Sequence, residues 1–555
     1  MARWSALRTV AGAVLLACHA SPSNETADGS LSLDASLSAD ASWTESNSDA
    51  TQVVDDSGGS GTAGSSSAEA PIFDVGGQDE SGTDSGPPPD MCHVGDGDLS
   101  GVGPCEDVAP PDSFDPEVQW SFTGPNGQIA CMTSPLVANL TDDDGNGEIN
   151  LCDTPDVVTV IGSSGETGPG NVVVLSGDDG TLLATFGQSV ALGITPALGD
   201  IDNDGLVEIV SAEPMGHLVA LEHDGTLKWT STSVWAANQT GAVALADLDN
   251  DGDVEIVAGS NVFDHLGNLV FTAPFDGLYS ASTAADLDGD GDLEAVFGHG
   301  AYHHDGTEYW VKPEIQMNVF SITSYPQVAN LDADPDPEVL VATELGIWLL
   351  EHDGTTVWSN FAPTGESGDW NRPVNIHDFD GDEAPEFGIS SYQHYGVYEV
   401  DQTPLFAANV VDFSGQAGGT AFDFLGSGIA QAIYADETQS FVFDIDGTIL
   451  MMTPRSSGTW TEYPTVADID NDGSAEILVG SDGNGSPTLQ AIRDTGDRWI
   501  PARRIWNQHT YHVTNVREDG TIPQHEPPSW ASLNTFRTQA QIAAGGDVCK
   551  PEPRG

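Results

Sequence analysis

The sequence has few basic residues, few cysteines and no long apolar run. Of its 555 residues only 14 are Lys or Arg, against 87 Asp or Glu, which gives a formal net charge of −73. Binding to nucleic acid or to an anionic membrane surface depends on Lys and Arg, so we expect neither interaction. Six cysteines in such a length exclude a small disulfide-built scaffold. The sequence also lacks an uninterrupted run of about 18 apolar residues, so it predicts no membrane-spanning helix.

Residues 1–18 have the pattern of a secretory signal, with Arg3 and Arg8 ahead of a short apolar stretch. The stretch ends in LLAC, which resembles a bacterial lipobox and implies a lipid on Cys18. His19 follows in place of the Asp that often marks inner-membrane retention. We therefore expect a lipid-anchored protein at the outer membrane or cell surface of a Gram-negative-type bacterium. An ordinary signal peptide with a coincidental Cys is the alternative.

Residues 19–115 consist mainly of Ser, Asp, Gly, Ala and Pro, with 20 acidic and no basic residues. Low hydrophobicity and charge of one sign predict a disordered tether between lipid and domain. A site for glycosylation or partner binding is the alternative for this segment. The folded domain is expected to span 116–545, followed by a tail at 546–555.

An Asp- and Gly-rich phrase recurs along the domain. Close copies read LGDIDNDGLVEIV, LADLDNDGDVEIV, AADLDGDGDLEAV and VADIDNDGSAEIL, and looser copies lie between them. The phrases start at 139, 200, 247, 286, 330, 378, 423 and 468. Eight copies at intervals of about 45 residues suit the four-stranded blades of a β-propeller.

Each acidic phrase leads into a hairpin phrase such as LVALEHDGTLKW (218–229) or WLLEHDGTTVW (348–358). Asp-Gly between alternating apolar runs is a strong hairpin signal, and helix signals are nearly absent from residue 116 onward. The fold class is therefore all-β, a propeller in which eight blades are favoured over seven. Residues 118–122 (VQWSF) are similar to the outer strand of each hairpin phrase, so we expect them to complete the last blade and close the ring.

These repeats, over about 116–490, resemble the FG-GAP/VCBS repeat family, the bacterial relatives of the integrin α-subunit propeller. In that family the D-x-D-x-D-G-x-x-[DE] loop binds Ca²⁺ and the propeller acts as a binding or adhesion module. The resemblance implies several Ca²⁺ ions and an extracellular protein or glycan as partner. The family also occurs in enzymes, so the fold does not itself exclude catalysis.

The residues of the loops agree with a cation site. Carboxylates at alternate positions turn inward, a Gly permits the bend, and one more carboxylate returns from the next strand, so the cage suits a hard divalent cation. Without a metal these carboxylates repel and raise one another's pKa values. Solvated Asx-turns explain any single loop equally well, but repetition favours metal. The predicted ligands are Asp200, Asp202, Asp204 and Glu208; Asp247, Asp249, Asp251 and Glu255; Asp286, Asp288, Asp290 and Glu294; Asn330, Asp332, Asp334 and Glu338; Asp378, Asp380, Asp382 and Glu386; and Asp468, Asp470, Asp472 and Glu476.

Three copies depart from this pattern. Pro335 and Pro337 stiffen the loop that begins at Asn330. The copy at Asp423 has Leu425 and Ser427 at ligand positions, so we expect no metal there. The first copy matches an EF-hand-like loop. Its predicted ligands are Asp142, Asp144, Asn146, the Glu148 carbonyl and Asp153.

Besides Cys18, five cysteines remain, and export permits disulfides. Cys131 and Cys152 bracket the first acidic loop, so we predict that they pair. Cys92 with Cys105 is a second expected pair, and the odd number leaves one Cys free or paired otherwise.

From Arg493 the composition changes, and eight of the 14 basic residues lie from there to Arg554. One hypothesis for this closing cassette, 493–545, is a carbohydrate or anion site with aromatic platforms and Arg side chains. The other hypothesis is a structural tail packed across the propeller. The residues proposed for ligand binding are Arg503, Arg504, Trp506, His509 and Tyr511.

The sequence favours a non-catalytic binding or adhesion module over an enzyme. It contains no G-x-S-x-G, H-E-x-x-H or P-loop motif. His303, His304 and His377 are interpreted as turn residues. The alternative function is a polysaccharide lyase or hydrolase on a propeller scaffold.

Overall fold

The computed structural model describes residues 92–93 and 102–551, except for 164–167, 236–239, 275–278, 316–322, 344–345, 365–369, 371, 414–415, 459, 484–485 and 544–546. The predicted signal, the lipidated Cys18 and most of the predicted tether lie outside these residues. Regular structure in the described part consists of strands and of four short 3₁₀ turns, η1 (Pro125–Gly127), η2 (Pro313–Ile315), η3 (Val513–Asn515) and η4 (Ser529–Ala531). No helix in this part is long and apolar enough to cross a membrane.

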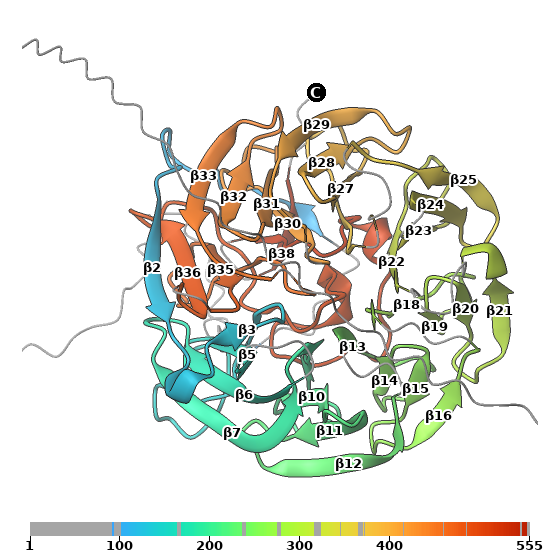
Figure 1. The fold of residues 1–555 in the computed structure, drawn as a ribbon, viewed down its shortest axis with the longest axis horizontal. Coiled ribbons are helices and arrows are strands. Elements are labelled where there is room, and N and C mark those ends of the chain that lie inside the picture. Colours follow the sequence, from blue (N-terminus) through green and yellow to red (C-terminus); the bar gives the residue numbers. More distant parts are fainter. Residues whose placement is uncertain are drawn as a thin grey trace, which may run out of the picture. The chain divides into compact units, whose positions relative to one another are not determined.

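The described strands pair into eight consecutive antiparallel units of four strands, arranged around a centre (Figure 1). Unit 1 contains β4 (Leu136–Ala138), β5 (Asp156–Gly162), β6 (Pro169–Ser176) and β7 (Leu182–Ala191), with β3 (Ala130–Cys131) also on β5. Unit 2 contains β9 (Ala197–Gly199), β10 (Glu208–Ala212), β11 (His217–Leu221) and β12 (Leu227–Val234). Unit 3 contains β13 (Thr240–Ala246), β14 (Glu255–Ala258), β15 (Asn261–Phe263) and β16 (Leu269–Thr272). Unit 4 contains β18 (Thr283–Ala285), β19 (Glu294–Val296), β20 (Gly300–Tyr302) and β21 (Glu308–Val311).

The second half of the chain continues the same arrangement. Unit 5 contains β22 (Thr323–Ala329), β23 (Glu338–Thr343), β24 (Gly346–Glu351) and β25 (Thr356–Phe361). Unit 6 contains β26 (Asn375–His377), β27 (Glu386–Ser390), β28 (His394–Tyr398) and β29 (Pro404–Asn409). Unit 7 contains β30 (Gly419–Phe422), β31 (Gln431–Ala435), β32 (Gln439–Phe443) and β33 (Ile449–Pro454). Unit 8 contains β34 (Thr465–Ala467), β35 (Glu476–Gly480), β36 (Leu489–Asp494) and β2 (Pro116–Phe122). Two short strands, β8 (Ile194–Thr195) and β17 (Tyr279–Ser280), pair in parallel with β13.

The burial of each strand follows its place in the unit. The inner and middle strands are Val-, Ile- and Ala-rich and buried on both faces, as in β5 and β10. The outer strands alternate or are largely exposed, as in β12. Strands covered on both faces have continuous apolar runs, whereas strands with one wet face alternate. The all-β propeller prediction is confirmed by this arrangement.

Aromatic side chains on the outer strands connect neighbouring units. Gly225, in the hairpin of unit 2, has a φ of 82°, and a Cβ placed there would lie 2.4 Å from the ring of Phe186 in unit 1. In the same way Gly267 of unit 3 receives Trp229 of unit 2, whose indole N–H donates to the His265 carbonyl at 2.9 Å. The glycine of the hairpin therefore serves the tight turn and also leaves room for the neighbour's ring.

The N-terminal strand closes the ring. Strand β2 pairs antiparallel with β36 and so supplies the outer strand of unit 8. Trp120 of β2 then donates to the Gly177 carbonyl of unit 1 at 2.7 Å and packs on Gly180. The predicted closure by residues 118–122 is confirmed.

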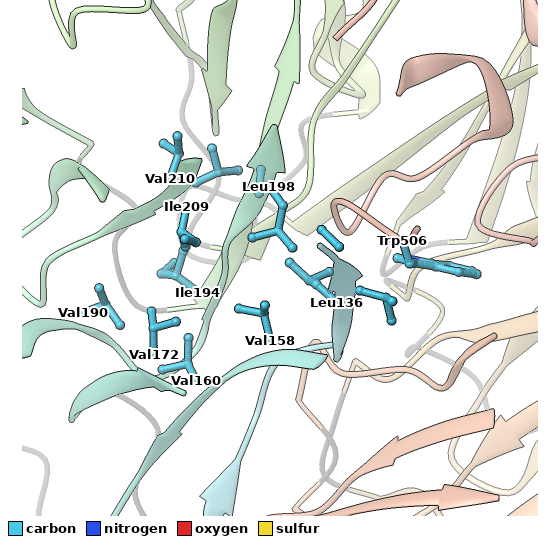
Figure 2. Close-up of a cluster of buried hydrophobic side chains, with 14 of the residues drawn as sticks. Leu136, Val158, Val160, Val172, Val190, Ile194, Leu198, Ile209, Val210 and Trp506 are labelled. Carbon is cyan, nitrogen blue, oxygen red and sulfur yellow. The ribbon is translucent and has the colours of Figure 1, made fainter. Parts of the chain in front are cut away.

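The chain after β36 forms no further unit, and we call residues 499–541 the C-terminal segment. In Figure 1 the red C-terminal part of the chain lies at the centre of the view. Backbone bridges join this segment to Val137 in unit 1, through Trp506, and to Ile376 in unit 6, through Phe536. Trp506 is fully buried beside Leu136 in the largest apolar cluster (Figure 2). The C-terminal segment is therefore part of the core of the ring.

Residues just before β2 also pack on the domain. Strand β1 (Gly103–Pro104) pairs in parallel with β38 (Val548–Lys550), which pairs with β37 (Gln541–Ile542). Cys105 forms a disulfide with Cys549. The Phe114 ring packs edge-on against Phe424 and at a tilt against Trp499, with ring centroids 5.9 and 5.3 Å away. The predicted tether boundary at residue 115 is therefore too late, because residues 102–115 belong to the folded unit.

Both predicted cysteine pairs are wrong. Cys152 pairs with Cys92 across a sequence separation of 60, and Cys105 pairs with Cys549 across 444 residues. Cys131 is a free, buried thiol on β3. It faces the core, where Thr159 lies 3.0 Å away, whereas Cys152 lies on the exposed acidic loop. The short distance between Cys131 and Cys152 in the sequence therefore does not bring the two side chains together.

Alkylation under denaturing but non-reducing conditions tests the pairing. Among the five cysteines from Cys92 onward, we expect only Cys131 to be labelled, because the other four are oxidised. Peptide mapping by mass spectrometry should find Cys92–Cys152 and Cys105–Cys549. A Cys131–Cys152 peptide would contradict the structure.

Candidate metal centres

Each acidic loop joins the first and second strands of a unit, and its hydrogen bonds turn the carboxylates inward. In unit 2, Asp200 Oδ2 accepts the Gly205 N–H at 2.9 Å, and Asp204 Oδ1 accepts the Leu206 N–H at 2.9 Å. The same bond from the bend to the first Asp recurs at Asp247 (2.8 Å), Asp286 (3.1 Å) and Asp468 (3.0 Å). At Asp378 the donor is Glu383, which keeps the left-handed bend at a φ of 74° without glycine. These five loops therefore share one backbone path.

The last Glu of each regular loop returns from the second strand and is bonded to the start of the loop. One carboxylate oxygen accepts the N–H of the residue after the first Asp or Asn. The pairs are Ile201 with Glu208 (2.9 Å), Leu248 with Glu255 (2.9 Å), Leu287 with Glu294 (2.8 Å), Leu331 with Glu338 (2.5 Å), Phe379 with Glu386 (2.7 Å) and Ile469 with Glu476 (3.0 Å). The structure thus brings every predicted terminal Glu into its own loop.

The second oxygen of these glutamates distinguishes the loops. Oε1 of Glu338, Glu386 and Glu476 is buried and has no hydrogen-bond donor, and the three side chains are at most 1% exposed. Asp247 Oδ1 and Asp468 Oδ1 are also buried without a donor. A buried carboxylate oxygen without a donor loses its solvation energy unless a cation compensates it. These five oxygens therefore point to cation positions.

The pKa values of the loop carboxylates agree with this need for a cation. Burial, reinforced by the charge of Asp380, raises the pKa of Glu386 to about 9. Burial raises the pKa values of Glu338 and Glu255 to about 8, with nearby aspartates adding to the effect. Without a positive charge in the loop, these side chains hold a proton near neutral pH.

Sets of ligand atoms lie close enough for a metal ion. Atoms of each set lie within 4.8 Å of one another in Asp378, Asp380, Asp382 and Glu386; in Asp142, Asp144 and Asp153; in Asp200, Asp202 and Glu208; and in Asp288, Glu294 and His303. Several acidic clusters can thus bind metal ions. His303, interpreted from sequence as a turn residue, contacts Glu294 Oε1 at 2.8 Å and belongs to such a set.

The neighbouring hairpin adds carboxylates that the sequence analysis missed. Glu222 groups with Asp204 and Glu208. Burial and then the charges of neighbouring loop aspartates raise the pKa values of Glu351 and Glu399, which begin the corresponding hairpins. The signal was present, because a Glu begins each of the hairpin phrases EHDG (twice) and EVDQ.

The first loop uses a different closing carboxylate. Asp142 accepts N–H groups from Gly145 and Gly147, and Asp153 accepts those of Asp143 and Asn150, all between 2.8 and 2.9 Å. Asp156, on β5, makes the bond that the terminal Glu makes elsewhere. It accepts the Leu140 N–H at 2.8 Å, and burial raises its pKa to about 7. Sequence reasoning missed Asp156 because the longer loop moves it out of the repeat's register.

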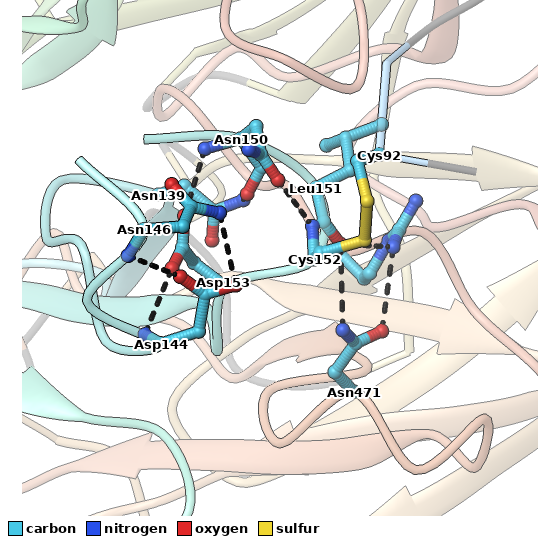
Figure 3. Close-up of a disulfide and its surroundings, with 10 residues drawn as sticks. Cys92, Asn139, Asp144, Asn146, Asn150, Leu151, Cys152, Asp153 and Asn471 are labelled. Carbon is cyan, nitrogen blue, oxygen red and sulfur yellow. Dashed lines mark hydrogen bonds between the residues drawn. A yellow bond between two sulfur atoms is a disulfide. The ribbon is translucent and has the colours of Figure 1, made fainter. Parts of the chain in front are cut away.

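This loop also differs at its exposed end. Asn146 and Glu148 are exposed, and the Glu148 N–H donates to Asn146 Oδ1 at 2.7 Å. The Cys92–Cys152 disulfide lies beside the loop (Figure 3). The loop end is therefore tied to the chain ahead of the domain.

Loop 423–431 does not fit a metal. Gln431 takes the place of the terminal Glu, and its Oε1 accepts the Phe424 N–H at 3.1 Å. Its Nε2 donates to the Ile429 carbonyl at 3.0 Å. The neutral amide meets its own hydrogen-bonding needs within the loop.

Asn330, in unit 5, also departs from the regular pattern. Its side-chain amide donates to the Asp334 carbonyl at 2.6 Å, and its backbone N–H donates to Asn534 Oδ1 at 2.9 Å. The Asn at this position thus contacts both its own loop and the C-terminal segment.

The five residues predicted for ligand binding are not on an open surface. Arg503, Trp506, His509 and Tyr511 are at most 1% exposed, and the Arg504 side chain is 13% exposed. Burial, and next the charge of buried Arg537, holds the pKa of His509 well below its usual value. These side chains belong to the core of the ring, so the proposed carbohydrate or anion site is wrong in this form.

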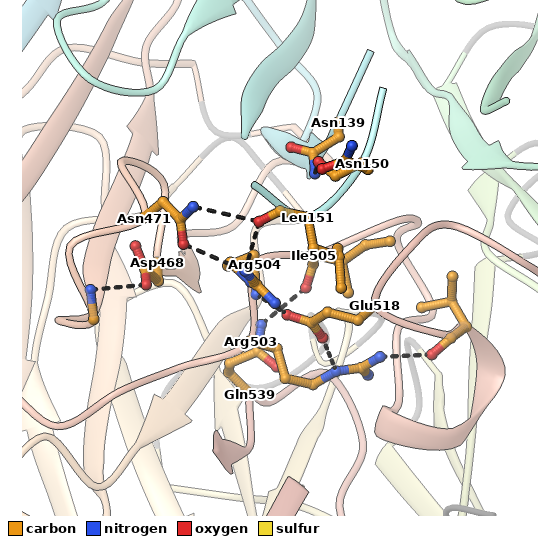
Figure 4. Close-up of polar contacts among 12 residues, drawn as sticks. Asn139, Asn150, Leu151, Asp468, Asn471, Arg503, Arg504, Ile505, Glu518 and Gln539 are labelled. Atoms are coloured by element: carbon orange, nitrogen blue, oxygen red, sulfur yellow. Dashed lines mark hydrogen bonds and ion pairs between the residues drawn. The ribbon is translucent and has the colours of Figure 1, made fainter. Parts of the chain in front are cut away.

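Arg503 and Arg504 instead hold the C-terminal segment together (Figure 4). Arg503 donates to the Val513 and Val516 carbonyls, each at 2.7 Å, and pairs with Glu518 at 2.9 Å. Arg504 donates to the Leu151 carbonyl of unit 1 at 2.8 Å. Buried guanidinium groups with this many acceptors stabilise chain that has no regular secondary structure.

The comparisons with known proteins agree with this fold. Residues 200–258 match the family described as FG-GAP-like repeat. The biofilm matrix protein Bap1 of V. cholerae is similar in structure, with a TM-score of 0.67, 20% identity, and coverage of 78% of this chain and 99% of Bap1. A rhamnogalacturonan lyase of Bacillus licheniformis has a TM-score of 0.46 at 15% identity, covering 77% of this chain and 82% of its own. No curated protein matches the sequence.

Substitution of Arg503 tests its structural role. Arg503→Met removes the donors to two buried carbonyls and to Glu518, so we expect the free energy of unfolding to fall by about 3 kcal/mol. Urea denaturation followed by tryptophan fluorescence measures the change. Arg493→Met, which removes the more exposed pair with Glu117, is the control and should change stability little. Equal effects of the two substitutions would contradict the role given to Arg503.

Proposed function

Since the chain carries the FG-GAP-like repeat and folds as a β-propeller, we propose that it is a calcium-stabilised, non-catalytic binding or adhesion module for an extracellular protein or glycan. The observation that carries the proposal is the set of buried carboxylate oxygens without donors at Glu338, Glu386 and Glu476. If the regular acidic residues bind cations in these loops, their role is to stabilise the fold. The same residues are then unavailable as acid and base in a reaction.

Calcium is the cation that suits these loops. Except in unit 4, where His303 joins the set, their ligands are oxygen atoms from carboxylates at alternate positions. Ca²⁺ accepts six to eight oxygen ligands in flexible geometry, with water and backbone carbonyls completing the shell. In an extracellular location, weak sites of about 10⁻⁴–10⁻³ M are filled. The bound ions then stabilise the folded loops at all times and do not act as a switch.

The proposed location follows from the first part of the chain. A lipid on Cys18 and the acidic segment that follows would hold the propeller at an outer membrane or cell surface, with the lipid as its sole contact with the bilayer. A folded domain on such a tether reaches partners away from the membrane.

The burial of the basic side chains in the C-terminal segment favours a binding module over an enzyme. Arg503, His509 and Arg537, in the C-terminal segment, are buried and hydrogen-bonded inside the protein. The cavity beside Asp378, Asp423 and Gln541 has a volume of about 50 Å³, room for water and too small for a sugar ring. The similar fold of Bap1, named as a biofilm matrix protein, fits a role in adhesion.

Calcium removal tests the stabilising role. We expect EDTA to lower the melting temperature and added Ca²⁺ to restore it. In EDTA the melting temperature should also fall as the pH rises from about 5 to about 9. The reason is that Glu386, with its pKa raised to about 9, keeps a proton in the folded chain that the unfolded chain releases near pH 4.5.

Differential scanning calorimetry with and without Ca²⁺ makes this measurement. Glu386→Gln should reduce both the gain from Ca²⁺ and the slope with pH, whereas Glu308→Gln, on an exposed outer-strand position, should change neither. A melting temperature unaffected by EDTA would contradict the calcium proposal.

Binding and cleavage assays on the same ligands separate a binding module from an enzyme. On arrays of acidic glycans and extracellular matrix proteins in Ca²⁺, we expect retention of particular ligands and loss of that retention in EDTA. Chromatography of the bound polysaccharides after long incubation should find intact chains. Shortened chains, absent with heat-denatured protein, would overturn the non-catalytic proposal.

A further inference from the structure

Loop 200–208 lies in the segment matched by the repeat family, yet it already holds a positive charge of its own. Lys228, on the outer strand β12, reaches into the loop of its unit. Its Nζ lies 2.5 Å from Asp202 Oδ2, 3.1 Å from Glu208 Oε1 and 3.2 Å from Glu222 Oε1. The ammonium therefore contacts the oxygen of Glu208 that corresponds to the donor-free oxygen of Glu338, Glu386 and Glu476.

Lys228 is alone at this position among the comparable hairpins. In each of them one residue of the outer strand bulges between two paired residues, and that residue is Lys228 between Leu227 and Trp229. The corresponding residues are Val270 in unit 3, Tyr309 in unit 4, Val357 in unit 5, Leu405 in unit 6 and Leu450 in unit 7. None of these side chains carries a positive charge, so the loops of units 3 to 7 lack a lysine at this position.

An ammonium at this place excludes a metal ion by contact and by charge. Its hydrogen bonds use the inward oxygens of Asp202 and Glu208, both predicted as ligands, and a Ca²⁺ ion needs the same oxygens at about 2.3–2.6 Å. Two cations a few ångströms apart repel strongly in a partly buried site. The Lys228 side chain is only 16% exposed, so moving it into water would also uncover its packed stem.

We propose that Lys228 is the resident cation of loop 200–208 and that this loop binds no Ca²⁺, although its sequence is one of the close copies of the motif. The inference rests on the proposed calcium binding by the other loops. The acidic loops then fall into three groups. Most bind a metal ion, the loop of unit 2 is stabilised by a lysine, and the loop of unit 7 is stabilised by a neutral amide. Loop 200–208 of unit 2 then keeps its folded conformation when Ca²⁺ is removed.

Counting bound Ca²⁺ in matched variants tests this inference. Lys228→Val, which copies units 3 and 5, should bind one more Ca²⁺ per chain than the wild type in equilibrium dialysis with ⁴⁵Ca²⁺. Val270→Lys, the reverse change in unit 3, should bind one fewer. Lys312→Val is the control for loss of a Lys outside any acidic loop and should leave the number unchanged, because Lys312 contacts Thr356 and Glu314.

The outcomes separate the two proposals. An equal, nonzero number in the wild type and in Lys228→Val overturns the lysine inference and leaves calcium binding intact. No bound Ca²⁺ in either protein overturns both. If Lys228→Val does not fold, Val270→Lys decides, because residue 270 is half exposed and tolerates a long side chain. An unchanged number in Val270→Lys then counts against the inference.

Discussion

The buried carboxylate at the end of each acidic loop is the interaction on which the rest of the propeller depends. One of its oxygens accepts a backbone N–H at the start of the loop, and this loop joins the first and second strands of a unit. Where this group is an ionised carboxylate inside the protein, its charge costs several kcal/mol unless a partner compensates it. The second oxygen must therefore find a cation or a donor. The loops differ in what meets that need.

The structure contains several solutions to this one constraint. Glu386 leaves its second oxygen without a donor, Glu208 contacts Lys228, and Glu294 contacts His303, which belongs to the same candidate metal set. Gln431 removes the charge altogether. Repeats with the same loop motif thus differ in the group that contacts the closing side chain, and the motif alone does not show which group that is.

The second organising element is the C-terminal segment, which fills the ring instead of adding to it. Its buried arginines bond to backbone carbonyls because irregular chain leaves many acceptors without partners. The basic, aromatic composition of this segment had two explanations at the level of sequence. Burial decides between them, since Arg503 and Trp506 lie in the interior.

The sequence by itself determined the all-β class, the repeating units, the closing strand at 118–122 and the terminal Glu of each regular loop. These features depend on local patterns, such as alternating apolar residues, Asp-Gly turns and fixed spacing, which act within a few residues of one another. Only the tertiary structure decided the Cys92–Cys152 and Cys105–Cys549 pairs, the role of Asp156 and the contact of Lys228 with loop 200–208. Each of these joins groups from different strands or from distant parts of the chain. Their meeting depends on how strands twist and which way side chains point, and spacing along the sequence does not carry that information.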